Sequence, residues 1–178
     1  ETLIINEYLK SKITLIPFDY YFELEDECKN LVKEAEDNDE KQFLVAKCFI
    51  EGSNLFPKNS SIGFKYLKKS RKNNNIEAII YYCEMLIKGN VIPMNHKKAE
   101  KLLEKIIKDK NFEIYNLLYG KMYKKENKIK ESIEKLLVAI SFENSDSMYE
   151  YFKIKIKEND LSSKENGIKY LKKAIENG

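Results

Sequence analysis

The sequence predicts an all-α protein, and three features of it support that fold class. Only 6 of the 178 residues are Gly and 3 are Pro, whereas an all-β sandwich needs many turn residues of both kinds. The chain is 43% hydrophobic and 34% charged, which is too apolar for a disordered polypeptide and too charged for a membrane protein. No stretch approaches the ~20 apolar residues that span a bilayer. The third feature is a helical stripe that recurs along the chain.

Residues 1–25 precede this stripe and form a separate predicted segment. A short helix is predicted from the apolar residues Leu3, Ile4, Ile5, Tyr8 and Leu9. A connection that could cap the first helix pair begins at Pro17, and its aromatic residues are Phe18, Tyr20, Tyr21 and Phe22. Alternatively, the segment is the end of an upstream domain. Because the chain starts at Glu1 without Met and stops at Gly178 on a repeat boundary, we expect it to be a piece of a longer protein.

Residues 26–178 carry the repeat. Small residues recur at intervals of 33 to 36 positions, and further stripe residues follow each of them after three, four and seven positions. That spacing is one face of an α-helix, so five helices with a common buried stripe are predicted. The small residues are Cys28, Gly63, Ala99, Ser132 and Gly167. The residues that follow them are Leu31, Tyr66, Leu102, Lys135 and Tyr170; Val32, Leu67, Leu103, Leu136 and Leu171; and Ala35, Ser70, Ile106, Ala139 and Ala174.

A further helix is predicted ahead of the stripe in each full repeat. Ala46, Cys83 and Gly120 recur every 37 residues among large apolar residues, and a small side chain there lets a neighbouring helix approach closely. The fourth copy has Tyr151 and Phe152 at this place, so its helix pair is expected to pack less tightly or to end the stack. The predicted repeats lie near residues 39–75, 76–111, 112–144 and 145–178.

Polar residues mark the predicted starts of the second helices. Asn59 or Ser60 and Asn95 are expected as N-caps, because their side chains accept hydrogen bonds from the first helical N–H groups. Ser162 is expected as the N-cap of the last helix, with Glu165 completing a capping box.

Leu137 and Val138 are apolar where the other copies of the helix carry charged residues. One interpretation is a register slip of one residue. The other is an exposed apolar patch that binds a partner protein or a second copy of this chain in a homo-oligomer.

The second copy carries a recognisable motif, with Ala78, Tyr82, Cys83, Leu86, Gly89, Ile92, Pro93, Asn95, Lys98, Ala99, Leu102, Leu103, Ile106 and Asn111. This pattern resembles the Sel-1-like repeat, a relative of the tetratricopeptide repeat. The resemblance covers about residues 39–178, plus a half-unit from about 26 to 38. It implies a right-handed α-solenoid of antiparallel helix pairs, with about four repeats and an N-terminal half-repeat.

Few residues of the chain suit catalysis or metal binding. His96 is the single histidine and is expected in the solvated first turn of a helix, and Cys28, Cys48 and Cys83 form no C-x-x-C motif. Three cysteines are an odd number, which favours a reducing, cytoplasmic location over a disulfide-rich secreted one. No phosphate-binding or nucleophile-elbow motif is present, so we expect no catalytic residues, metal or cofactor and no enzymatic activity.

The resemblance implies that the first helix of each pair lines a concave groove. Its exposed residues would form three rows: Phe43, Ile80, Leu117 and Tyr149; Lys47, Glu84, Lys121 and Lys153; and Ile50, Ile87, Lys124 and Ile156. An apolar row beside a charged row suits a peptide with alternating anchors and acidic groups. Alternatively, the apolar residues pack within the stack.

The leading functional hypothesis is a non-catalytic scaffold or adaptor that holds a partner polypeptide in this groove. The alternative is a structural spacer or dimerisation module of a larger protein. Nucleic-acid binding through lysine-rich helix faces is less favoured, because Arg71 is the only arginine and the formal net charge is only +3. No membrane insertion is expected.

Overall fold

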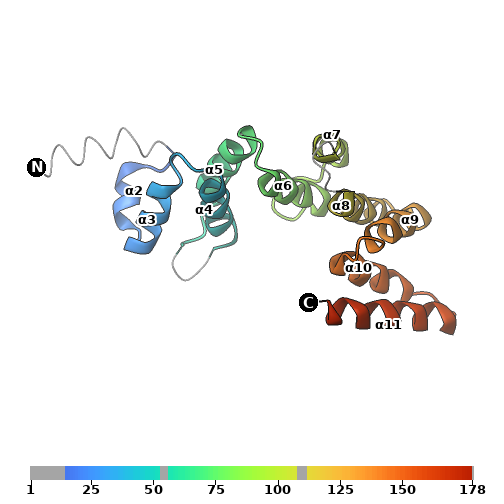
Figure 1. The fold of residues 1–178 in the computed structure, drawn as a ribbon. Coiled ribbons are helices and arrows are strands. Elements are labelled where there is room, and N and C mark those ends of the chain that lie inside the picture. Colours follow the sequence, from blue (N-terminus) through green and yellow to red (C-terminus); the bar gives the residue numbers. More distant parts are fainter. Residues whose placement is uncertain (1–14, 53–55, 108–111, 178) are drawn as a thin grey trace, which may run out of the picture. The chain divides into compact units, whose positions relative to one another are not determined.

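The computed structural model describes residues 15–52, 56–107 and 112–177, and these residues form helices and no strand (Figure 1). The predicted all-α class is therefore confirmed for this part of the chain. The helices are α2 (Phe18–Glu23), α3 (Asp26–Glu34), α4 (Asp39–Glu51), α5 (Ser60–Lys72), α6 (Ile76–Lys88), α7 (His96–Ile107), α8 (Phe112–Lys125), α9 (Ile129–Ile140), α10 (Ser145–Lys155) and α11 (Leu161–Glu176).

The chain divides into two compact units, of which the first ends at Tyr81 and the second begins at Tyr82, within α6. In the first unit, α4 and α5 pack against each other, and α3 contacts α4. The aromatic segment after Pro17 forms α2 rather than a simple connection. The Tyr20 ring lies 6.5 Å from the Phe49 ring of α4, so α2 packs beside the first helix pair. The helix expected near Leu3 to Leu9 lies outside the described residues.

In the second unit, α8 packs on α9 and α10 packs on α11, while α9 also contacts α10 (Figure 1). Leu136 of α9, Met148 and Tyr151 of α10 and Ala174 of α11 belong to one buried apolar cluster. Helix α7 contacts α8 and is joined to α6 through the Cys83 thiol, whose Sγ lies 3.8 Å from the Ala99 carbonyl oxygen. Each helix of this unit therefore contacts helices that are near to it in the sequence.

The small residues of the repeat lie where paired helices cross. Ala46, Cys83, Ala99 and Ser132 are fully buried. A Cβ atom on Gly63 of α5 would lie 2.9 Å from the Ala46 carbonyl oxygen of α4, which is closer than real Cβ contacts. The predicted close approach of paired helices is confirmed at these positions, because larger side chains would overpack the crossing.

The last pair has a small residue at its crossing on α11 only, because α10 has large residues there. A Cβ atom on Gly167 of α11 would lie 2.9 Å from Lys155 Cβ and 3.6 Å from a ring carbon of Phe152. The nearest backbone atom to this Cβ is Phe152 Cα at 3.7 Å, compared with 2.9 Å at Gly63 and 3.4 Å at Gly120, so the backbones of this pair approach less closely, as expected. The small residue on α11 alone is enough to let the two helices approach.

Three linkers of different length close with the same hydrogen bond. The Asn59 N–H donates to the Phe49 carbonyl at 2.8 Å, and the Asn95 N–H donates to the Leu86 carbonyl at 2.9 Å. In the third pair the Lys128 N–H donates to the Tyr123 carbonyl, also at 2.9 Å. Phe49, Leu86 and Tyr123 hold equivalent positions, three residues after Ala46, Cys83 and Gly120. The linkers therefore differ in sequence and length, but the same backbone hydrogen bond closes each of them.

Asparagine is the usual N-cap in this protein. The Oδ1 atoms of Asn59 and Asn95 accept hydrogen bonds from the N–H groups three residues later, which confirms both predicted caps. Asn144 caps α10 in the same way. For α11 the prediction is wrong, because Asp160 rather than Ser162 is the cap and accepts from the Ser163 N–H at 2.8 Å. A carboxylate at residue 160 lets the helix begin at Leu161, which places Ser162 inside the first turn.

The stripe keeps its register in α9. Ser132, Leu136 and Ala139 are fully buried, while Leu137 and Val138 are 41% and 44% exposed. The register-slip interpretation is therefore wrong, and the two residues lie on the outer face of the helix. Within the described part of the chain, no helix is both long enough and apolar enough to cross a membrane.

Candidate functional site

The second unit contains a pocket of about 830 Å³. Three first helices of successive predicted repeats, α6, α8 and α10, supply most of its lining. The turns after α8 and α10 and the first residue of α9, Ile129, supply the rest. The lining residues are Glu84, Ile87, Lys88, Lys121, Lys124, Lys125, Asn127, Ile129, Glu150, Lys153, Ile154, Lys157 and Glu158. Three lining residues are isoleucines, of which Ile129 is exposed and Ile87 and Ile154 are buried, and the remaining lining residues are charged apart from Asn127.

One side of the pocket is an ion pair between α6 and α8. The Lys121 ammonium lies 2.9 Å from Glu84 Oε1, and the Lys88 ammonium lies 3.5 Å from Glu84 Oε2. Burial by itself raises the pKa of the Glu84 carboxyl, but the two ammonium groups outweigh it and the pKa lies below its ordinary value. Glu84 is therefore ionised at neutral pH and holds Lys121 in place.

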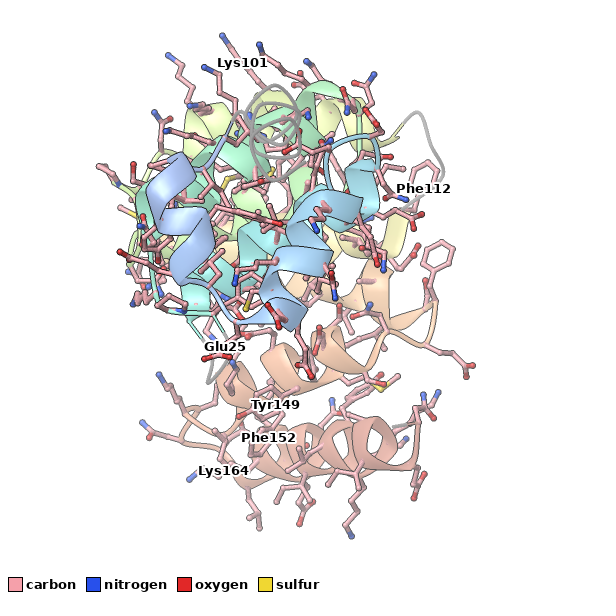
Figure 2. The ribbon with its side chains drawn as sticks, turned by 90° about the vertical axis from the view of Figure 1, so that its left-hand side faces the viewer. Glu25, Lys101, Phe112, Tyr149, Phe152 and Lys164 are labelled. Carbon is pink, nitrogen blue, oxygen red and sulfur yellow. The ribbon has the colours of Figure 1, made fainter. Side chains whose placement is uncertain are left out.

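The other side is an ion pair between α8 and α10. Glu150 Oε2 accepts a hydrogen bond from the Lys124 ammonium at 3.0 Å, and Glu150 Oε1 accepts one from the Lys153 ammonium. Burial raises the pKa of Glu150, and the hydrogen bonds from both lysines lower it further than burial raises it. The Lys153 ammonium also lies 4.5 Å from the centre of the Tyr149 ring, which stacks beside Phe152 on α10 (Figure 2).

Positive charge exceeds negative charge in this lining. Of the described residues that line the pocket, six are lysines and three are glutamates. Glu84 and Glu150 are already paired, and Glu158 accepts from the Lys155 ammonium at 2.9 Å. The side-chain ammonium groups of Lys125 and Lys157 have no ion-pair or hydrogen-bond partner among the described residues, and both residues are exposed. These two ammonium groups are the ones most available to an anionic ligand.

The structure brings five of the predicted groove residues into this pocket: Glu84, Ile87, Lys121, Lys124 and Lys153. Tyr149 and Ile156 are exposed but do not line it. In the first unit, Lys47 is exposed, Ile80 is half-buried, and the half-buried Phe43 ring meets the Tyr81 ring edge-on at 5.6 Å.

Three predicted groove residues are not exposed as expected. Ile50, Ile87 and Leu117 are buried. Leu117 belongs to the apolar cluster around Leu136, and Ile50 faces the helix crossing at Gly63. The interpretation that the apolar residues pack within the stack is correct for Ile50 and Leu117, whereas Ile87 is buried but lines the pocket.

Glu150 was not predicted from the sequence, although, like Glu84, it binds two lysines of the pocket. Glu150 lies three positions before Lys153, on the same face of a helix, so an acidic partner for that lysine could have been found from spacing. Lys125 and Lys157 were also missed. Lys125 is the last residue of α8 and Lys157 lies in the turn after α10, and both are beyond the last groove position predicted for their helix.

His96 begins α7, as expected, but it is not solvated. Its side chain is 15% exposed, and Nδ1 lies 2.8 Å from Glu126 Oε1 in the turn after α8. This contact joins α7 to the next helix pair and explains the burial of the ring. Among the described residues, no group of His, Cys, Asp or Glu side chains is arranged to hold a metal ion.

Comparisons with known proteins add no family to this description. No family model matches the chain, and no curated protein matches it.

Proposed function

We propose that this protein is a non-catalytic scaffold or adaptor that holds a partner polypeptide in the pocket formed by α6, α8 and α10. The observation that supports this function is the lining itself, which combines isoleucine side chains with an excess of lysine over glutamate. A peptide with apolar anchors and acidic groups complements both properties. We further propose that the helix pairs form a right-handed α-solenoid of Sel-1-like repeats, about four with an N-terminal half-repeat.

The partner does not need to break the existing ion pairs. Glu84 with Lys121 and Glu150 with Lys124 join neighbouring helices and give the pocket its walls. The acidic groups of a peptide would instead meet Lys125 and Lys157, which line the pocket and are exposed. We place the protein in the cytoplasm, because an odd number of cysteines suits a reducing compartment.

The test uses a fluorescent peptide in which Leu and Glu alternate. The double variant Lys125→Glu/Lys157→Glu should weaken binding at least about tenfold, which corresponds to about 1.4 kcal/mol. The matched control is Lys101→Glu/Lys105→Glu on α7, which changes the net charge equally at exposed residues outside the pocket. Binding that both double variants weaken equally, or that neither weakens, would contradict the proposal.

A spacer or dimerisation module is the second candidate, and the exposure of Leu137 and Val138 favours it. Sedimentation of the wild-type chain and of Leu137→Lys/Val138→Lys distinguishes the two functions. A dimer that this double variant dissociates would support the second candidate, and a monomer at all concentrations would exclude dimerisation through this patch.

A further inference from the structure

Three lysines at equivalent positions line the pocket. In each of α6, α8 and α10, a lysine follows by five residues the position at which the helix crosses its second helix. The crossing positions are Cys83, Gly120 and Phe152, and the lysines are Lys88, Lys125 and Lys157. We call these three lysines the lysine row.

The lysine row is exposed in every helix that contributes to it. Lys88 and Lys125 are exposed although a further helix pair follows each of them, so their exposure does not depend on where the sequence ends. Lys88 lies 3.5 Å from Glu84 Oε2, while Lys121 lies 2.9 Å from the other oxygen of the same carboxylate. Lys88 can therefore turn to a ligand without leaving Glu84 unpaired. The ammonium groups of Lys125 and Lys157 have no partner among the described residues, so all three are available to an anionic ligand.

The glutamates of the pocket disfavour a densely charged ligand. Glu84, Glu150 and Glu158 line the same pocket as the lysine row. A polyanion with a charge on every unit would bring some of its charges close to these carboxylates, and like charges repel. A ligand whose negative charges are well separated avoids this repulsion, because it places neutral groups beside the glutamates.

The packing of the helices sets the spacing of those charges. Ion pairs join α6 to α8 and α8 to α10, so the three helices are neighbours. Neighbouring helices lie about 8–10 Å apart, and equivalent residues on them are separated by a similar distance. A polyproline II segment rises about 9 Å over the three residues of one turn, so every third side chain lies on one face at a matching distance. A β-strand matches less well, because side chains on one face are about 7 or 13 Å apart.

An α-helix with acidic residues at every seventh position also matches, since seven residues rise about 10 Å. Asn127 favours the extended segment over this helix. It lines the pocket, is exposed, and its side chain has no hydrogen-bond partner in the described part of the chain. Its amide group donates hydrogen bonds, and a polyproline II backbone has free carbonyl groups to accept them. The carbonyl groups of an α-helix are already bonded within the helix.

We propose that the partner segment is a polyproline II stretch with Asp or Glu at every third residue, whose carboxylates meet Lys88, Lys125 and Lys157. Asn127 donates a hydrogen bond to a backbone carbonyl of this stretch. The inference rests on the proposed function, because it specifies the conformation and the charge spacing of the polypeptide that the pocket holds.

The probes are three fluorescent peptides with blocked ends and the same number of Glu residues. The spaced peptide repeats Glu-Pro-Pro three times, the clustered peptide has the same residues with its Glu adjacent, and a longer helical peptide has Glu at every seventh position. Fluorescence anisotropy with the full chain should show that the spaced peptide binds at least about tenfold more tightly than either of the others. Inorganic polyphosphate should displace it only at more than about ten times its concentration.

Lys88→Gln tests a contact that the proposed function does not itself require. It should weaken binding of the spaced peptide at least about threefold, which is within the contribution of one partly exposed ion pair. The matched control is Lys101→Gln on α7, which removes the same charge from an exposed residue outside the pocket and should leave binding unchanged.

The peptide of alternating Leu and Glu, which tests the proposed function, is the reference. If the reference binds but the clustered or the helical peptide binds as tightly as the spaced one, the inference is overturned and the proposed function remains. An equal effect of Lys88→Gln and Lys101→Gln has the same meaning. If polyphosphate binds more tightly than every peptide, the pocket is a polyanion site and the inference is overturned. If neither the reference nor the spaced peptide binds, both the inference and the proposed function are wrong.

Discussion

Gly120 lies where α8 and α9 approach closely. A Cβ atom at this position would lie 2.7 Å from Leu136 Cγ, and Leu136 is itself fully buried. The Ser132 hydroxyl of α9 donates a hydrogen bond to the Gly120 carbonyl at 2.8 Å, which joins the two backbones at the crossing. Both positions therefore require small residues, although for different reasons: one needs space, and the other needs a short hydroxyl group.

Gly120→Leu should reduce the free energy of unfolding by about 1–3 kcal/mol, the usual range for overpacking a close-packed core. The physical cause is the collision with Leu136. Chemical denaturation of the wild type and the variant measures the difference, provided that the slope of the transition is unchanged.

The double variant Gly120→Leu/Leu136→Ala tests this cause. Removing the Leu136 side chain makes room for the new one, so the two substitutions together should cost less than the sum of the single ones. Additive losses would show that the substitution acts elsewhere than at the crossing.

Between elements, the first helices of successive pairs are joined by charge. Glu84 on α6 binds Lys121 on α8, and Lys124 on α8 binds Glu150 on α10. The pKa values of both carboxyl groups lie below the ordinary value of 4.5 in the folded protein. The unfolded chain therefore binds protons more readily, and the stability that these pairs contribute is lost as pH falls through the folded pKa values.

We expect acid to weaken these two ion pairs between the first helices. The melting temperature should fall as pH is lowered below about 4.5, and Glu84→Gln/Glu150→Gln should show a smaller fall than the wild type. Because the pairs are partly exposed, solvent screening keeps the contribution of each at about 1 kcal/mol or below at neutral pH.

Calorimetry at several pH values measures both effects. The control is Glu131→Gln/Glu134→Gln, which removes the same charge from exposed positions on α9. An equal pH dependence in the two double variants would show that the ion pairs of Glu84 and Glu150 do not contribute to the acid sensitivity of the melting temperature.

Across the whole molecule, features set by spacing along the chain were predictable from sequence. Ala46, Gly63 and Ser132 could be placed at helix crossings because a small residue at a fixed point of a helical stripe has one structural use. Ion pairs such as that of Glu150 with Lys124 could not be predicted from the sequence. The two residues are 26 positions apart, and their contact depends on how two separate helices pack. Ile87 and Leu117 were predicted to be exposed but are buried, for the same reason. The pattern of an apolar residue near a groove is the same whether its side chain faces the groove or the core.

The described helices pack mainly against neighbours in sequence, as α4 does with α5 and α9 does with both α8 and α10. In a stack of this kind, stability is close to a sum of contributions from units and from the contacts between adjacent units. A local substitution should therefore have a local effect. In a bundle with a single shared core, the same substitution would destabilise every helix.

Native-state hydrogen exchange of Gly120→Leu distinguishes these two cases. Amides of α8 and α9 should exchange about tenfold faster for each 1.4 kcal/mol of lost stability, while amides of α4 and α5 keep their wild-type rates. The matched variant is Gly63→Leu, at a crossing where a Cβ atom would lie 2.6 Å from Ile50 Cγ1, and it should show the opposite pattern. If either substitution accelerates exchange equally in all of these helices, the chain unfolds as one cooperative core. The solenoid that we propose, whose units depend only on their neighbours, would then be wrong.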